Sequence, residues 1–95
     1  MKIAELRNGM NNVNVKAKVV ELSEEKEILT RFGTVTTLTE AKIKDDSGSI
    51  KLVLWGRQSE GIEEGNEIEI KNGFVKVFRD ELQLSIGRNG SIKVI

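Results

Sequence analysis

The sequence predicts an all-β domain, a closed Greek-key barrel of five strands with a short helical connection between the third and fourth strands. Apolar and polar residues alternate along several short segments, as they do in strands with one buried face. Nine glycines separate these segments and proline is absent, so the sequence supplies turns without breaking the strands between them. With 95 residues, 38% of them hydrophobic, the chain can build one domain around one core, and we expect residues 1–95 to form it.

The strands follow from the alternation, segment by segment. In residues 13–20 every second residue from Val13 to Val19 is apolar, and these residues share the inward face. A polar arm then leads to a turn at residues 31–33, where Gly33 can adopt a positive φ. In chain order the predicted segments are strand 13–20, arm 23–30, returning strand 34–44, turn 45–48, strand 49–55, connection 57–64, strand 68–78 with a bulge at 72–73, turn 79–80, strand 81–86 and a final extended piece 92–94.

Two of the connections are predicted from turn chemistry. At residues 45–48 we expect aspartate side chains to cap backbone amides and Gly48 to supply a left-handed conformation. This capping explains the two aspartates better than a metal site does. The segment 57–64 is polar, and we expect it to form one helical turn around Ile62 that ends at Gly65.

The composition argues against an enzyme. Cysteine and histidine are both absent, which removes disulfides, thiolate and imidazole metal ligands, and the commonest general base. There is no phosphate-binding glycine loop and no paired nucleophile and base, so we expect no catalytic residue, metal, cofactor or small-molecule substrate. No apolar run is long enough to span a membrane, and the acidic N-terminal segment does not resemble a signal peptide. These features fit a cytoplasmic protein.

The outward positions of the predicted strands are rich in lysine, although 15 basic and 15 acidic residues give a net charge of zero. Strand parity leaves Glu40 as the only acid among them, whereas Glu67 and Glu69 face outward elsewhere. We therefore expect one basic face, which is the electrostatic footprint of a groove that follows a nucleic-acid backbone. The outward lysines are Lys16, Lys18, Lys42, Lys44, Lys51 and Lys76.

Three of the four aromatic residues share this outward parity. Trp55 follows the outward positions of its strand, and Phe74 and Phe78 lie outward if Val75 and Val77 point into the core. A small barrel gains most by burying its largest apolar side chains, so outward aromatics interleaved with lysines indicate a binding surface. Exposed aromatic rings stack on bases of any sequence, at about 1–3 kcal/mol per base.

Each aromatic position has an alternative interpretation. A bulge at the end of its strand would turn Trp55 inward to cap the barrel, and Phe74 adjoins the predicted bulge at 72–73. Phe32, at the tip of the arm, is either a fourth contact or a packing partner of Leu29 and Leu38 within its own hairpin. We favour the packing role for Phe32.

The whole pattern resembles the OB-fold domain of archaeal single-stranded DNA-binding proteins and their replication protein A relatives. The resemblance implies that Trp55, Phe74 and Phe78 stack on bases, although relatives often carry tryptophan at the position of Phe74. Arg57 and Arg79 lie next to these aromatics and join the lysines as candidate phosphate contacts. Together the matching segments cover nearly the whole chain, and they are residues 3–10, 12–15, 40–56, 62–66, 72–78 and 82–84.

The resemblance implies single-stranded DNA as the partner, in replication, repair or recombination, together with proteins of those processes. Single-stranded RNA or tRNA is an alternative, because anticodon-binding domains share the Asp-x-Ser-Gly turn and nothing in the sequence selects for or against a 2′-hydroxyl. A protein-interaction module, with the aromatics as anchors, is a third possibility. The sequence ends near the predicted end of the barrel, so it is either one domain of a longer protein or a short form without the tail that recruits partners in some relatives.

Overall fold

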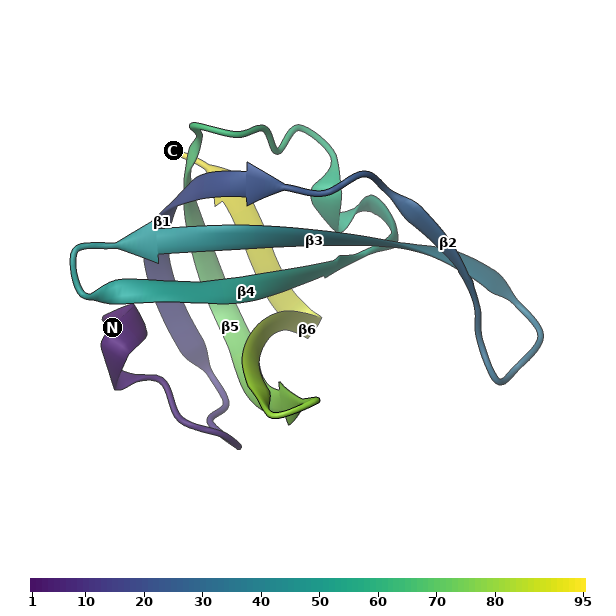
Figure 1. Cartoon of the computed structure of the whole chain (residues 1–95), viewed down its shortest axis with the longest axis horizontal. Coiled ribbons are helices and arrows are strands. Elements are labelled where there is room, and N and C mark those ends of the chain that lie inside the picture. The colour runs from purple at the N-terminus through teal and green to yellow at the C-terminus, as the bar shows by residue number, and fades with distance from the viewer.

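A computed structural model describes residues 1–95, apart from the side chain of Arg88. These residues form six strands and two short 3-10 helices, and five of the strands wrap around a common centre (Figure 1). The elements are η1 (Ile3–Glu5), β1 (Val13–Leu22), β2 (Lys26–Leu29), β3 (Val35–Asp45), β4 (Gly48–Trp55), η2 (Gly56–Ser59), β5 (Glu67–Phe78) and β6 (Glu81–Val94). Neither helix in this described chain is long and apolar enough to cross a membrane.

Five strands close into a barrel. β1 pairs with both β3 and β5, β5 pairs with β6, β6 with β4, and β4 with β3, so the sheet returns to its starting strand. All of these pairings are antiparallel except that of β4 with β6, which is parallel. The predicted fold class, an all-β five-stranded barrel, is therefore confirmed.

The core contains the inward residues that the alternation predicted. Burial in β1 follows a strict period of two from Val13 to Val19. The largest side chains at the centre include Leu52, Leu54 and Leu84, which have no exposed surface, so truncating one to alanine would cost about 2–5 kcal/mol. The N-terminal segment adds Ile3 and Leu6 to this core.

The remaining strand, β2, belongs to the arm rather than to the barrel. It pairs only with the first part of β3, and this hairpin projects away from the barrel (Figure 1). Its tip is Phe32, which is 85% exposed, and the cross-strand pair Leu29 and Val35 is exposed as well. The favoured interpretation of Phe32 as a packing partner of Leu29 and Leu38 is therefore wrong, because the short hairpin has no second layer that would cover the ring.

Three local predictions are corrected. Gly48 does not adopt a left-handed conformation, and the Asp45 carboxylate accepts hydrogen bonds from the Ser47 and Gly48 amides across the turn. The helical turn lies at η2, before Ile62, which is buried in the core. The extended piece 92–94 is not separate: it continues β6 and pairs with the first residues of β5.

The predicted bulge in β5 is confirmed, and the residue in the left-handed backbone conformation is Asn72 rather than the neighbouring glycine. The register of β5 against β6 shifts between Lys71 and Gly73, and Asn72 between them has a φ of 55°. Beyond this bulge Val75 is buried, as predicted, but Val77 is 45% exposed. Val77 is almost the last residue of β5, where the β5–β6 hairpin reaches past the rim of the core.

Candidate nucleic-acid interface

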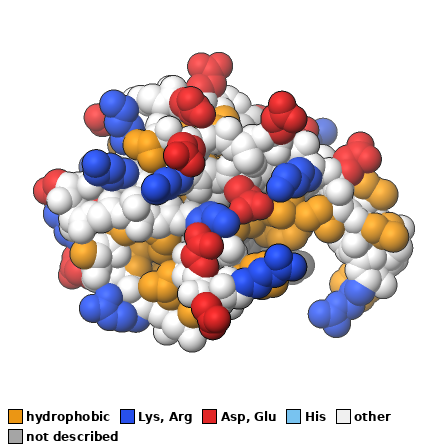
Figure 2. Space-filling model, viewed as in Figure 1, with side chains coloured by type: hydrophobic (Ala, Val, Ile, Leu, Met, Phe, Trp, Pro, Cys, Tyr) orange, Lys and Arg blue, Asp and Glu red, His pale blue; other side chains and the backbone are white. Residues whose placement is uncertain are grey.

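A groove runs over the outer surface where β4, β6 and β5 lie side by side, and the β2–β3 arm forms one of its walls. Figure 2 shows hydrophobic side chains exposed in the hollow between the barrel and the arm, edged by basic and acidic side chains. The groove has a volume of about 360 Å³. It is lined by Ile28, Leu38, Glu40, Lys51, Val53, Trp55, Lys76, Phe78, Arg79, Glu81 and Gln83.

Trp55 lies in this groove at the end of β4. Its side chain is on the outer surface and the residue is 39% exposed, so the alternative that it turns inward to cap the barrel is wrong. Gln58 of η2 holds it there. The Trp55 amide donates to Oε1 of Gln58 at 2.8 Å, and Nε2 of Gln58 donates to the Ile86 carbonyl at 3.1 Å. One side chain thus ties the end of β4 to β6 beyond the last backbone pair of these strands.

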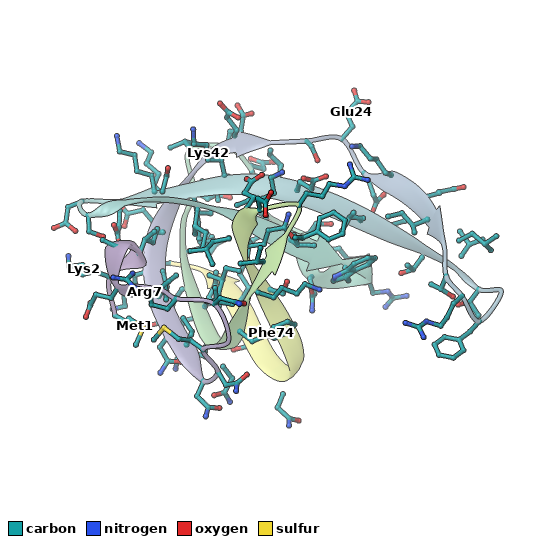
Figure 3. All side chains as sticks on the ribbon, turned by 60° about the horizontal axis from the view of Figure 1, so that its bottom comes forward. Met1, Lys2, Arg7, Glu24, Lys42 and Phe74 are labelled. Carbon is teal, nitrogen blue, oxygen red and sulfur yellow. The ribbon has the colours of Figure 1, made fainter. Side chains whose placement is uncertain are left out.

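The two phenylalanines follow one another along the outer face of β5. Phe78 is 54% exposed and lines the groove. Phe74 is half-buried beside β6, where its ring lies 3.6 Å from the position that a Cβ on Gly87 would occupy (Figure 3). The bulge does not turn Phe74 inward, because it opposes Ser85, an outward residue of β6. The predicted outward parity of all three aromatics is therefore confirmed.

A cation accompanies each of these phenylalanines. Nζ of Lys76 lies 5.9 Å from the centroid of the Phe74 ring, and Cζ of Arg79 lies 5.3 Å from that of Phe78. Such contacts are worth about 0.5–1 kcal/mol at exposed sites, so they hold the positive charges beside the aromatic surfaces. Arg57, one of the η2 residues, is exposed two residues after Trp55.

Lys51 lines the groove and is paired with two carboxylates. Its Nζ lies 3.0 Å from Oε2 of Glu40 and 3.6 Å from Oε2 of Glu81, and Glu40 is also 3.8 Å from Lys26. The hydrogen bond to Glu40 raises the pKa of Lys51 above its ordinary value of 10.5. These four side chains neutralise one another at one end of the groove, so Lys51 is less available to a phosphate than Lys76 or Arg79.

The other predicted lysines do not line the groove with the aromatics, and their part in a single basic face stays a prediction. Lys16 and Lys18 oppose Glu69 and Glu67 across the β1–β5 pair, and Lys16 lies 3.8 Å from a carboxylate oxygen of Glu69. Lys18 and Lys44 oppose each other and line a separate hollow. Lys42 lies opposite Lys51 across the β3–β4 pair and lines a hollow that adjoins the groove. Figure 3 shows it apart from Phe74. In a closed barrel the outward positions of different strands point in all directions around the axis, so a shared parity does not imply a shared face.

Comparison with known proteins agrees with this geometry. The profile of the family described as single-stranded DNA binding protein Ssb-like, OB fold, matches residues 6–94. The chain belongs to this family. The family description includes the OB fold, and the five-stranded closed barrel described above agrees with it.

Individual relatives support the assignment. The chain is 37% identical over 91 residues to the single-stranded DNA binding protein Ssb of Saccharolobus solfataricus, covering 96% of this chain and 61% of that protein. It is also 37% identical over 98 residues to replication factor A of Methanothermobacter thermautotrophicus, covering 97% of this chain and 12% of that protein. The solved second OB-fold domain of replication protein A from Methanococcus maripaludis matches with a TM-score of 0.85 and 30% identity, over the whole of this chain and 93% of that one.

The Ssb-like groove also contains residues that the sequence interpretation missed. Val53, Gln83 and Ser85 have outward parity yet are buried, with Gln83 and Val53 on the groove lining. The alternation of Gln83 and Ser85 with core residues of β6 was visible in the sequence. Their neighbours in space were not: the parallel pairing of β4 with β6 places these two residues between Trp55 on β4 and the phenylalanines on β5.

Proposed function

We propose that the groove binds single-stranded DNA with little sequence preference, by stacking bases on Trp55, Phe74 and Phe78. The observation that carries the proposal is the position of these rings. A 95-residue barrel leaves Trp55 39% and Phe78 54% exposed along one outer groove, where burial would have stabilised the fold more. The match to the Ssb-like family supports the choice of single-stranded DNA as the ligand.

The phosphate contacts in this proposal come from Lys76, Arg79 and Arg57. The first two are held beside stacking rings, and Arg57 follows Trp55 in η2. With about 0.7 counterions released per contact, three such cations give a slope of about −2 for log K against log salt. We propose further that this binding serves DNA replication, repair or recombination in the cytoplasm, where the protein associates with the nucleoid and with other proteins of these processes.

Fluorescence titration tests the proposal directly, because Trp55 is the only tryptophan. Oligothymidine should quench its emission with a Kd in the micromolar range or below. Phe78→Ala should raise Kd by roughly 5- to 150-fold, which corresponds to about 1–3 kcal/mol per stacked base. A fluorescence signal that does not change on titration would contradict the proposal.

A pair of lysine variants separates the groove from the rest of the surface. Lys76→Gln should weaken binding and lower the salt slope by about 0.7, since it removes one phosphate contact. Lys18→Gln removes the same charge from a lysine that lines a different hollow, and its affinity and slope should match those of the unmodified protein. Equal losses in the two variants would place the contacts outside the groove. RNA of equal length, titrated in parallel, tests the RNA alternative.

A further inference from the structure

β6 carries a short strip of outward polar side chains, and this strip reaches the groove at Gln83. Its outward residues Gln83 and Ser85 alternate with Leu84 and Ile86, which belong to the core. Because β6 lies between β4 and β5, this strip runs between the strand that ends in Trp55 and the strand that carries the two phenylalanines. Gln83 therefore occupies the place that the edges of stacked bases would face.

Strand register fixes the neighbours of the strip. Gln83 is opposite Lys51 on β4 and opposite Lys76 on β5. Ser85, two residues further along, is opposite Val53 and Phe74. Side chains on one face of paired strands lie about 5 Å apart, which is within reach of a base that stacks on the ring of Phe74 or Phe78.

Both side chains are buried without being part of the core. Ser85 is 1% exposed, and its Oγ has no hydrogen-bond partner among the described residues. Gln83 is 7% exposed and lines the groove. A buried hydroxyl without a partner destabilises a fold, and an apolar side chain on this strip would avoid that cost. Gln83, the member of the strip that lines the groove, is thus placed to meet a polar ligand there.

We propose that Gln83 donates and accepts hydrogen bonds at the edges of the stacked bases, which assumes the proposed function. A carboxamide presents one acceptor and one donor group side by side, and it can rotate to exchange them. It therefore pairs equally well with the N4 donor of cytosine and with the O4 acceptor of thymine. Gln83 thus adds a polar contact to a base without selecting among bases.

The substitution Gln83→Glu tests this idea, because a carboxylate can accept hydrogen bonds but cannot donate them. Kd is measured for oligodeoxycytidine and oligothymidine of equal length. In the unmodified protein the two values should be similar. In Gln83→Glu the ratio of the thymine Kd to the cytosine Kd should rise by about fivefold or more, since good base-edge pairs discriminate at that level. Lys76→Gln is the matched control: it changes the charge of the groove by the same amount at the opposing position and should leave the ratio unchanged.

A second variant distinguishes a loss of hydrogen bonds to the bases from a loss of folding. Gln83→Met keeps the size of the side chain and removes its hydrogen bonds, so it should weaken binding to both oligonucleotides by the same factor while the thermal midpoint is kept. A ratio that stays the same in Gln83→Glu, or a Gln83→Met variant that binds like the unmodified protein, would overturn the inference although the protein still binds DNA. Failure of the unmodified protein to bind either oligonucleotide would instead overturn the proposed function.

Discussion

The turn between β5 and β6 has an unfavourable backbone conformation and carries a cation that lines the groove. Phe78 and Glu81 pair across it, so Arg79 and Asp80 form a two-residue loop. Both have a positive φ, 53° for Arg79 and 62° for Asp80, which is the pattern of a type I′ turn. Such turns strongly prefer Asn-Gly. The arginine found here instead lies over the Phe78 ring.

The size of the conflict follows from the two backbone angles. A left-handed conformation costs an L-residue about 1–2 kcal/mol, and less for aspartate, whereas glycine adopts it freely but loses about 0.5–1 kcal/mol of chain entropy on folding. Asp80→Gly should therefore stabilise the domain by about 0.5 kcal/mol. For a domain of this size that corresponds to a rise of roughly 2–4 °C in Tm. Arg79→Asn, added to it, relaxes the turn further but removes the cation.

Urea unfolding and oligothymidine titration of the same two variants decide the matter. Asp80→Gly should be more stable and should bind at least as tightly as the unmodified protein. Arg79→Asn combined with Asp80→Gly should keep the extra stability, bind several-fold more weakly and show a salt slope smaller by about 0.7. The reasoning fails if Asp80→Gly is not stabilised, or if the double variant binds as tightly as Asp80→Gly.

Three further predictions concern other parts of the fold. Partial burial opposes ionisation of Asp45, but hydrogen bonds from the Ser47 side chain and from the Ile3, Ser47 and Gly48 amides lower its pKa from 3.8 to about 2. Its ionised form therefore adds stability that is complete above about pH 4 and disappears as the pH falls to about 2; acid unfolding of Asp45→Asn should lack this component. Gly90→Ala should destabilise the domain by about 1–3 kcal/mol in urea, because a Cβ would lie 2.8 Å from Cγ2 of Ile86 and 2.9 Å from the Asn72 carbonyl oxygen, whereas Gly48→Ala, whose nearest atom would be 4.0 Å away, serves as the tolerated control. Phe32→Ser should leave the unfolding free energy within about 0.5 kcal/mol, because the ring is 85% exposed, and should weaken binding only for oligonucleotides long enough to reach the arm; an equal loss with short ones would show that the tip acts differently.

The sequence was sufficient to predict the barrel because the apolar alternation within each strand identifies its inward face. Val13 to Val19 and Ile50 to Leu54 alternate regardless of how the strands are arranged, and every one of their inward residues is buried. The outward parity of Trp55, Phe74 and Phe78 follows from the same local rule. Period-two reasoning is reliable here because it depends on neighbours along the chain and not on neighbours in space.

The grouping of outward residues could not be predicted in this way, because it depends on register and closure. Lys18 and Lys76 are both outward lysines, but one opposes Glu67 on the β1–β5 side and the other opposes Gln83 in the groove. Gly48 shows the same limit at a turn. Its conformation was decided by the reach of the Asp45 carboxylate, which also accepts a hydrogen bond from the distant Ile3 amide.

The charge arrangement that closure creates bears on how the groove binds. At one end Lys51 is neutralised by Glu40 and Glu81, which leaves Lys76 and Arg79 as the cations of the lining beside the aromatic rings. A groove with so few available cations gains little from counterion release: a slope of about −2 changes K only about 16-fold between 50 and 200 mM salt. Three stacked bases contribute more, at about 1–3 kcal/mol each. A domain of zero net charge can therefore bind single strands well, provided that stacking supplies most of the affinity, and alanine at Trp55 or Phe78 should weaken binding more than glutamine at Lys76.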